Sequence, residues 1–340
     1  MNTSIIQNIT FPLHQALYKR ETRKYLLELN ETQWYSKEQI KEYQLNKLKK
    51  LTEHSFKYSK YYNYLFLVNN INPEELNNFN DFSKIPLLSK EEAIASYDDI
   101  ICEDVDRRKL IWGTTSGSTG VPFRYAQDRK ACDFRDAIEL RSRSWWGIKY
   151  GDPVFVIWGS RGSFSTISKD RIKYKIENIK AKLYNRYKFS AYDLSPSNMN
   201  KWIQEFFRIK PKSIYSYVSS AYFFAQHILN YNVDLSGLGL KIVICTSEPL
   251  FKKQRSIISK AFNCQVVNEY GVSESGICAF ECSHGSFHIM SENIYLEIIR
   301  NGKNIKDGEI GEIVITQLNN FAAPLIRYHT GDLGRIRNKN

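Results

Sequence analysis

Apolar residues recur along the chain at two spacings, and these spacings predict its main elements. Residues 12–68 show roughly helical spacing with many aromatic side chains, and Ser36 with Gln39 fits a capping box that would start a helix. Between residues 154 and 267, apolar runs of strand length alternate with amphipathic helical segments. Short β-type segments follow at 294–299 and 312–316. The pattern predicts an α/β protein with parallel sheets and a short β-rich C-terminal part.

Polar clusters follow the predicted strands. Strands are predicted at 154–158, 213–218, 240–245 and 265–267, and helices at 128–146, 203–207, 221–229 and 252–261. In parallel α/β sheets, ligands bind at the loops that follow the carboxyl ends of the strands. Four polar clusters are expected to converge on such loops, at 114–120, 246–249, 268–274 and 327–332.

The first cluster lies in a loop rich in glycine and hydroxyl side chains. Residues 112–123 read Trp-Gly-Thr-Thr-Ser-Gly-Ser-Thr-Gly-Val-Pro-Phe, after an apolar approach and before a helical run. Glycine lets the backbone approach a ligand closely, while hydroxyls and free N–H groups suit phosphate oxygens. The loop is not a Walker A motif, because no Gly-Lys-Ser/Thr follows the glycines. Taken alone, it fits a connecting surface loop as well as a phosphate site.

Residues 169–188 form a strongly basic segment, with eight Lys or Arg against two acids. Its apolar residues Ile172, Ile176, Ile179 and Leu183 are spaced by four, three and four, which predicts one stripe of a helix. The favoured interpretation is a helix with a solvated basic face. The alternative is a surface that docks an anionic substrate or makes peripheral contact with a membrane.

Composition narrows the class of protein. The chain has 340 residues, 42% of them hydrophobic and 14% aromatic, which suits a folded protein with a large core. The net charge of +12 favours an acidic partner, but the excess is diffuse and no nucleic-acid-binding motif is present, so no nucleic acid is expected. Six cysteines do not make a disulfide framework, and we find no signal peptide or transmembrane run. These features predict a cytoplasmic protein.

The polar clusters together supply the chemistry of a nucleotide site. They contain hydroxyls for phosphates, the Glu274 carboxylate for a hard cation such as Mg²⁺, the Tyr270 ring for a base, and Asp332 beside a glycine. A serine-hydrolase elbow is excluded because residues 271–275 lack the final glycine. No His-Glu-x-x-His and no Gly-x-Gly-x-x-Gly motif is present. Each residue alone also fits a packing, capping or turn role.

Three of these segments, in this order, resemble the signature motifs of the adenylate-forming (acyl-CoA synthetase) superfamily. They are residues 115–122 (Thr-Ser-Gly-Ser-Thr-Gly-Val-Pro), 269–274 (Glu-Tyr-Gly-Val-Ser-Glu) and 326–333 (Ile-Arg-Tyr-His-Thr-Gly-Asp-Leu). The branch that the chain most resembles contains phenylacetate–CoA ligase, coenzyme F390 synthetase and CapK-type capsular polysaccharide proteins. Segments 210–220, 247–249 and 281–288 are similar to that branch as well, so the resemblance spans roughly residues 35 to 337.

The resemblance implies the large N-terminal domain of such an enzyme and assigns a role to each motif residue. ATP phosphates would be held by Thr115, Ser116, Gly117, Ser118, Thr119 and Gly120. The adenine would be lined by Ser247, Glu248, Pro249, Asn268, Tyr270 and Gly271, and the ribose bound by Asp332. Ser273 would contact the α-phosphate, Glu274 would hold Mg²⁺, and Arg327 would lie near the phosphates or support its own loop. The implied reaction joins a carboxylate to AMP with release of pyrophosphate.

The chain departs from the family pattern at two places. The phosphate loop continues Gly120-Val121-Pro122 where the family often has a lysine, so either ATP binding is weaker or the task of the nearby cation falls to Arg124. The chain also stops at Asn340, eight residues after Asp332, whereas the family continues into a small lid domain that carries a catalytic lysine. We therefore expect a large domain without its lid, divided into a helical part (1–100), an α/β nucleotide-binding core (101–290) and a β-rich end (291–340).

The expected function is ATP-dependent activation of a carboxylic acid to acyl-AMP, and onward to CoA or another acceptor such as a sugar. The CapK branch is preferred, which implies a role in capsular or surface polysaccharide biosynthesis. A rival hypothesis is a non-catalytic AMP- or acyl-AMP-binding protein that lost its lid. Cys278, Cys282, His284 and His288 offer a zinc-type spacing, but packing is the preferred interpretation there. Trp158 and Tyr217 are expected near the acyl group, which permits an aryl acid without requiring one.

Overall fold

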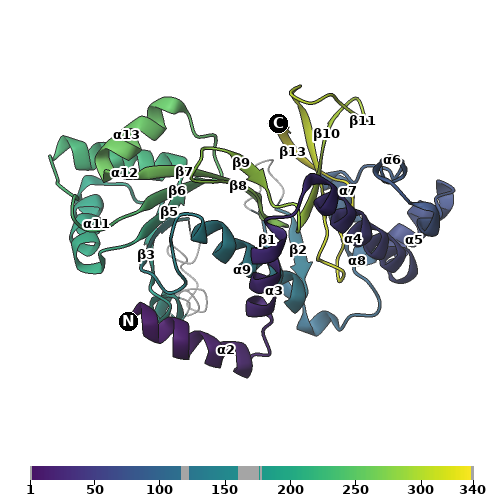
Figure 1. Cartoon of the computed structure of the whole chain (residues 1–340), viewed down its shortest axis with the longest axis horizontal. Helices are drawn as coiled ribbons and strands as arrows, with labels where there is room; N and C mark the ends of the chain where they lie inside the picture. Colours follow the sequence, from purple (N-terminus) through teal and green to yellow (C-terminus); the bar gives the residue numbers. More distant parts are fainter. Residues whose placement is uncertain (1, 116–121, 160–175, 177, 338–340) are drawn as a thin grey trace. The chain divides into compact units, whose positions relative to one another are not determined.

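The computed structural model describes residues 2–115, 122–159, 176 and 178–337 (Figure 1). The chain forms two compact units that interleave along the sequence. Unit 1 comprises Met1–Lys19, Leu140–Gly271 and Ala279–His288, and unit 2 comprises Arg20–Glu139, Val272–Cys278 and Ile289–Asn340. The predicted division of the chain near residues 100 and 290 remains a prediction.

A seven-stranded sheet contains most of the predicted strands, in the order β4-β3-β5-β6-β7-β8-β9. The strands are β3 (Val154–Trp158), β4 (Arg186–Ser190), β5 (Ser213–Tyr217), β6 (Ile242–Thr246), β7 (Gln265–Val272), β8 (Gly276–Glu281) and β9 (Phe287–Ile289). The pairings from β4 through β7 are parallel. Every residue of β6 is buried, as expected for a parallel strand with both faces covered. The predicted α/β class is confirmed.

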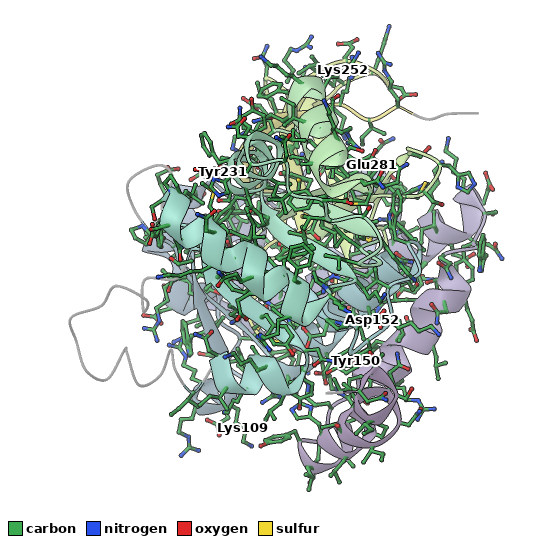
Figure 2. All side chains as sticks on the ribbon, turned by 90° about the vertical axis from the view of Figure 1, so that its left-hand side faces the viewer. Lys109, Tyr150, Asp152, Tyr231, Lys252 and Glu281 are labelled. Atoms are coloured by element: carbon green, nitrogen blue, oxygen red, sulfur yellow. The ribbon has the colours of Figure 1, made fainter. Side chains whose placement is uncertain are left out.

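Three helices pack on this sheet and form the main core of unit 1 (Figures 1 and 2). They are α11 (Pro196–Ile209), α12 (Val218–Asn230) and α13 (Lys252–Phe262). Phe155 of β3 stacks on Phe189 of β4 with 4.0 Å between ring centroids, and Phe206 of α11 meets Phe155 at 5.4 Å. Burying each such ring contributes about 1.5–3 kcal/mol, so this aromatic cluster is a main source of the unit's stability.

Three short N-terminal helices also belong to unit 1. They are α1 (Thr3–Ile5), the π-helix η1 (Ile6–Thr10) and α2 (Phe11–Leu17). Ile6 is fully buried and packs against Gly151. A Cβ atom added at Gly151 would lie only 2.8 Å from the Ile6 side chain, which is too close. Gly151 also has a φ of +82°, a conformation that favours glycine. The N-terminal helices are thus packed against the turn that precedes β3.

Unit 2 combines a helical layer with two small sheets. The helices are α3 (Thr22–Thr32), α4 (Lys37–Tyr58), α5 (Lys60–Val68), α6 (Phe79–Phe82), α7 (Lys90–Ala95), α8 (Tyr97–Ile100) and α9 (Arg129–Ser144), which runs on into unit 1, with 3₁₀ turns at Pro73–Glu75 and Arg107–Lys109. The predicted capping box at Ser36 and Gln39 is present. Tyr62 and Phe66 of α5 are fully buried, so these two rings pack in the interior of unit 2.

The two sheets of unit 2 are antiparallel. One is a hairpin of β1 (Ile111–Thr114) and β2 (Arg124–Gln127). The other has the order β11-β10-β12-β13, built from β10 (Ile294–Arg300), β11 (Lys303–Asn304), β12 (Gly311–Gln317) and β13 (Tyr328–Gly334). The predicted β-rich C-terminal part is therefore present.

Three local predictions were wrong. Residues 186–188 were expected to end the basic helix, but they begin β4, in which Tyr187 and Phe189 alternate with polar residues and pair with β3. Residues 268–272 were expected in a loop, yet they complete β7, and residues 328–332 lie in β13. In each case strand pairing overrides the polar character of the residues.

Only the end of the basic segment falls within the described residues, as helix at 176 and 178–183. Three members of the predicted apolar stripe lie there, and each is about half exposed: Ile176, Ile179 and Leu183. Ile172 lies outside the described residues. Within the described part of the chain, no helix is both long and apolar enough to cross a lipid bilayer.

Candidate active site

Glu274 lies in the tight turn between β7 and β8, and its side chain is buried in unit 2 with only 6% exposed. The hydroxyl of Tyr328, the first residue of β13, donates a hydrogen bond of 2.9 Å to the carboxylate Oε1. The side-chain amide of Gln127, at the end of β2, donates to the Glu274 backbone carbonyl at 2.8 Å. Both the carboxylate and the turn that carries it are therefore held in place.

Opposing influences set the pKa of Glu274, and the net shift is upward. Burial raises this pKa most, because an ionised carboxylate loses hydration, and the negative charge of Asp332 raises it further. The Tyr328 hydrogen bond and the positive charge of Lys90 lower the pKa. The structure thus brings two predicted site residues, Glu274 and Asp332, within electrostatic reach of each other. Tyr328 and Lys90, to which the sequence analysis gave no role, also influence this carboxylate.

Lys90 is placed by a short contact between the segment before α7 and β13. The Leu88 N–H donates to the Arg327 carbonyl at 3.0 Å, and the His329 N–H donates to the Leu88 carbonyl at 2.9 Å. Ser89 then caps α7 by accepting from the Glu92 N–H at 3.1 Å. Local sequence did not indicate a role for Lys90, because the contact with β13 joins residues far apart in the chain.

The hydroxyl-rich loop joins β1 to β2, with Thr114 paired opposite Arg124 at its base. Residues 116–120, to which a phosphate-binding role was assigned, lie outside the described residues. Thr115 is described: its N–H donates to the Phe123 carbonyl at 2.9 Å, and its hydroxyl accepts from the Phe123 N–H at 2.9 Å. The Arg124 guanidinium lies 4.0 Å from the centre of the Trp112 ring, in a cation–π contact. Arg124 therefore stands at the base of the loop.

Arg327 is fully engaged within unit 2. Its guanidinium pairs with the Glu297 carboxylate at 3.0 and 3.1 Å, and both side chains are almost completely buried. The same guanidinium donates to the carbonyl oxygens of Ser83 and Ile85, each at 2.5 Å. Arg327 also has a φ of +50°, which is uncommon outside glycine. Of the two roles expected for Arg327, these contacts favour support of its own segment.

The predicted adenine-side residues 247–249 follow β6 in unit 1, and all three are exposed. Ser247 has a φ of +68°, so the chain turns sharply at the end of the strand. Glu248 then accepts hydrogen bonds from the Ser219 N–H at 2.6 Å and the Ser219 hydroxyl at 2.9 Å. Because Ser219 lies in the first turn of α12, the Glu248 carboxylate caps that helix.

Asn268, Tyr270 and Gly271 lie along β7 rather than after it. The Asn268 N–H donates to the Glu281 carboxylate at 2.8 Å, and Arg255 pairs with the same carboxylate at 2.8 Å. The Tyr270 ring is half-buried. Ser273 is exposed in the turn that leads to Glu274. By its residues, the predicted site divides into an adenine-side group in unit 1 and a Glu274 group in unit 2.

Aromatic rings stack at the carboxyl ends of β3 and β5. Trp158 and Tyr217 stack with 4.3 Å between ring centroids, and Trp158 also stacks on Tyr215 at 5.3 Å. The Tyr215 hydroxyl donates to the Glu269 carboxylate at 2.9 Å. The two residues expected near the acyl group, Trp158 and Tyr217, are therefore in contact with each other.

The cysteine and histidine residues of the predicted zinc-type spacing do not form one cluster. Cys282 and His288 lie side by side, with 3.2 Å between the thiol sulfur and Nε2. The Cys278 thiol donates instead to the Gly276 carbonyl at 3.6 Å. His284 is exposed, beside the Ser283 hydroxyl. Zinc at these four residues gains no support.

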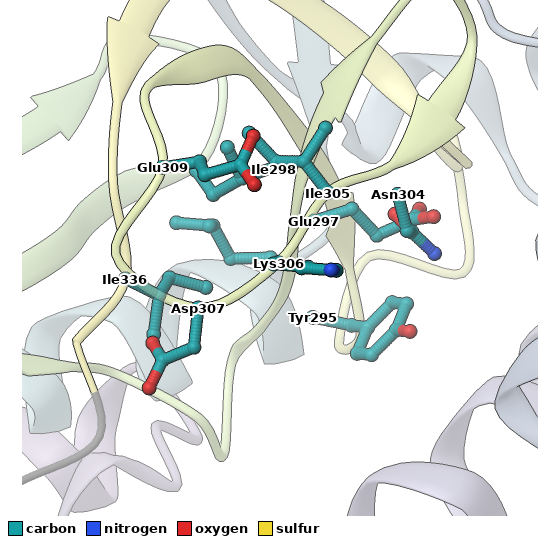
Figure 3. A pocket seen from close by; sticks show the side chains of 10 residues that line it. Tyr295, Glu297, Ile298, Asn304, Ile305, Lys306, Asp307, Glu309 and Ile336 are labelled. Carbon is teal, nitrogen blue, oxygen red and sulfur yellow. The ribbon is translucent and has the colours of Figure 1, made fainter.

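A hollow of about 180 Å³ lies beside β10 in unit 2 (Figure 3). Its lining includes Tyr295, Glu297, Lys306 and Ile336. Figure 3 shows the Lys306 ammonium directed toward the side of the hollow where Asn304 and Tyr295 lie. None of the predicted site residues lines this hollow, although Glu297 is the partner of Arg327.

Comparison with known proteins connects this fold to acyl-activating enzymes. CapK from Staphylococcus aureus is 26% identical over 288 residues, which cover 83% of this chain and 60% of CapK. Phenylacetate-coenzyme A ligase from Aromatoleum evansii is 26% identical over 309 residues, covering 88% of this chain and 67% of the ligase. No family model matches the chain.

Among solved structures, 2-hydroxyisobutyryl-CoA ligase in complex with 2-HIB-AMP and CoA superposes with a TM-score of 0.72 at 20% identity. The superposition covers 89% of this chain and 65% of that ligase. The fold is therefore that of an adenylate-forming CoA ligase. In sequence, the chain is similar to CapK and to phenylacetate-CoA ligase, so the resemblance seen in its motifs is confirmed. The chain spans about three fifths of CapK and two thirds of the phenylacetate ligase.

Proposed function

We propose that this protein activates a carboxylic acid with ATP. A carboxylate oxygen would attack the α-phosphorus, the bond from that phosphorus to the pyrophosphate oxygen would break, and acyl-AMP and pyrophosphate would form. A thiol such as CoA would then attack the acyl carbon, the bond from that carbon to the phosphate oxygen would break, and AMP would leave. The observation that carries this proposal is the buried Glu274 carboxylate, fixed by Tyr328 and lying within electrostatic reach of Asp332 and Lys90. The CoA ligases among the relatives support it.

The Glu274 group fits a hard divalent cation. The pKa of Glu274 is raised because its charge is buried and lies near Asp332, and a bound cation would offset both effects. Carboxylate oxygen is the ligand type that Mg²⁺ prefers, so Glu274 would hold Mg²⁺ with the ATP phosphates. Mg²⁺ would neutralise charge that develops on the phosphates. The Tyr328 hydroxyl would keep the carboxylate in one orientation.

Other residues of unit 2 would bind and orient ATP. Thr115 and the hydroxyl-rich loop would hold the β- and γ-phosphates, and Ser273 would contact the α-phosphate. Lys90 and Arg124 would supply positive charge where the loop lacks its usual lysine. Asp332, exposed in β13, would bind the ribose hydroxyls. Arg327 would position β13 through Glu297, because its guanidinium is already engaged.

Residues of unit 1 would receive the adenine and the acyl group. Tyr270 would lie against the base, with Asn268 and residues 247–249 around it. The sharp turn at Ser247 and the contact between Glu248 and Ser219 would hold residues 247–249 in place beside the base. The Trp158–Tyr217 stack offers a flat aromatic surface next to which an aryl acid would fit.

Similarity to CapK supports a finer assignment. We place this activity in the biosynthesis of a capsular or surface polysaccharide, with a sugar as the final acceptor of the acyl group. The exposed apolar residues Ile176, Ile179 and Leu183, in a basic segment, would let that segment contact a membrane surface peripherally. The protein would then act at the cytoplasmic face of the membrane.

A screen of carboxylic acids by ATP–pyrophosphate exchange tests the proposal. We expect at least one acid to give exchange that requires Mg²⁺ and is lost in Asp332→Asn. Asp307→Asn, an exposed aspartate in the same C-terminal part, is the matched control and should retain exchange. AMP binding without exchange for any acid would instead support a non-catalytic nucleotide-binding protein and would contradict the proposal.

A further inference from the structure

Three side chains of metal-binding type converge in unit 2, and none takes part in the proposed adenylation site. They are His54 on α4 and Cys102 and Asp104 in the segment that follows α8. One ligand atom from each, an imidazole nitrogen, the thiol sulfur and a carboxylate oxygen, lies within 4.8 Å of the other two. This is the one such group of three that the described residues contain.

Packing and backbone hydrogen bonds hold the three residues in place. The His54 ring lies against Tyr58, at 4.8 Å between centroids, and meets the edge of Phe321 at 5.3 Å. The Cys102 N–H donates to the Ala322 carbonyl at 2.9 Å, and the N–H of the next residue donates to the Tyr58 carbonyl at 2.9 Å. The arrangement is therefore fixed before any ligand binds.

The polar atoms of His54 and Asp104 do not hydrogen-bond each other. His54 Nε2 is buried and has no hydrogen-bond partner. The Asp104 carboxylate is its charged neighbour at 3.6 Å, beyond hydrogen-bond distance. The Cys102 side chain is 1% exposed. A buried polar nitrogen without a partner is costly, so a ligand that binds all three groups would relieve that cost.

We propose that His54, Cys102 and Asp104 bind one zinc ion. Imidazole, thiolate and carboxylate are the three ligand types that zinc takes in proteins, and three protein ligands leave a fourth position for water. The Asp104 side chain is about one third exposed, so the ion would enter from that side. The bound ion would join the last turn of α4 to the segment after α8, and would stabilise the helical layer of unit 2.

Zinc binding at this site should release a proton. The Cys102 thiol is almost completely buried in the metal-free structure. Zinc binds the thiolate, and the thiol proton must leave as the metal enters. Affinity should therefore rise with pH, and the heat of binding should depend on the ionisation enthalpy of the buffer.

Titration of the metal-free full chain with Zn²⁺, and with Co²⁺ as a coloured substitute, tests the proposal. We expect one equivalent of either ion to bind, a thiolate-to-cobalt charge-transfer band, and a rise in Tm with Zn²⁺. Asp104→Asn should weaken zinc binding by at least about tenfold. Removing a residue that only hydrogen-bonds a metal ligand already lowers metal affinity roughly 10- to 100-fold. Cys102→Ser should abolish the cobalt band.

Two control variants separate this site from others. Asp98→Asn changes an exposed aspartate of α8, just before the segment that carries Cys102 and Asp104, and Cys282→Ser removes the other cysteine that lies beside a histidine. Both should bind the metal like the wild type. The proposal is overturned if the wild type shows no thiolate–cobalt band, if Asp104→Asn binds as tightly as the wild type, or if Cys282→Ser removes the band. Because Asp104 is partly exposed, its variant should fold even if Cys102→Ser does not.

Discussion

At the scale of single residues, the ionisation of Glu274 depends on contacts made by groups far away in the sequence. Burial and Asp332 act against the ionised form, while Tyr328 and Lys90 favour it. Tyr328 remains a hydrogen-bond donor because burial and the adjacent Glu274 raise its own pKa above the ordinary value. In the proposed site Glu274 would hold Mg²⁺ only when ionised, so these neighbours should determine how activity depends on pH.

Tyr328→Phe should shift the acid limb of the pH–rate profile to higher pH. The lost hydrogen bond lowered the pKa of Glu274, so its removal raises that pKa further, and activity disappears at a higher pH as the medium is acidified. The profile of kcat/KM for ATP measures the shift. An unchanged acid limb in a folded variant would show that Glu274 is not the group whose ionisation limits the reaction.

Glu274→Gln should lower Mg²⁺-dependent pyrophosphate exchange by roughly 10²- to 10³-fold, the size expected when one preorganised electrostatic contact to a transition state is lost. Glu309→Gln, a partly exposed glutamate paired with Arg300, is the control and should leave exchange unchanged. The free energy of unfolding should not fall in Glu274→Gln, because a buried charge becomes neutral. Exchange at the wild-type rate would remove Glu274 from the site.

The sequence predicted Glu274 and Asp332 because each stands in a recognisable ordered motif. It did not predict their neighbours. Tyr328 lies in a motif without a distinguishing pattern of its own, and Lys90 is simply the first residue of α7, after the Ser89 cap. Their roles arise from pairing between β13 and the segment before α7, which joins residues about 240 positions apart. Contacts of this range leave no signal in local spacing.

At the scale of elements, a buried ion pair links β10, β13 and the segment before α7. Arg327 contacts Glu297 of β10 and two carbonyls of residues 83–85, while its own backbone precedes β13. The pair costs desolvation free energy, which its complete set of hydrogen bonds offsets. Arg327 therefore fixes the strand that carries both Tyr328 and Asp332.

Arg327→Met should lower the free energy of unfolding by roughly 3–5 kcal/mol, because it leaves the Glu297 charge buried without a partner. Adding Glu297→Leu should restore much of the loss. Urea denaturation of the two variants measures both effects. If Arg327→Met keeps wild-type stability and loses pyrophosphate exchange, Arg327 acts on the phosphates directly and the positioning role is wrong.

Strand periodicity was more informative for apolar strands than for polar ones. The strand predicted at 154–158 coincides with β3, and helix α13 lies within one residue of its prediction, because both carry a clear apolar pattern. The polar end of β7 and the alternating residues of β4 were assigned to other elements. Those residues form strands because neighbouring strands satisfy their backbone groups, which no local pattern records.

At the scale of the whole molecule, the predicted site motifs alternate between the two units along the sequence. The hydroxyl-rich loop belongs to unit 2, residues 247–249 and Tyr270 to unit 1, and Glu274 and Asp332 again to unit 2. The order of motifs indicated the resemblance to CapK and phenylacetate-CoA ligase, although identity to these relatives is only about one quarter. The acyl substrate has no such motif, so it must be found by experiment.

Oxygen transfer from substrate to nucleotide tests the central claim, that this chain joins a carboxylate to AMP, most directly. The acid that gives the strongest exchange is labelled with ¹⁸O in its carboxylate and incubated with ATP, Mg²⁺ and hydroxylamine, which traps the acyl group. Attack on the α-phosphorus predicts AMP carrying one ¹⁸O atom and an equal amount of acyl-hydroxamate. AMP without label, or label in inorganic phosphate together with ADP, would contradict the account.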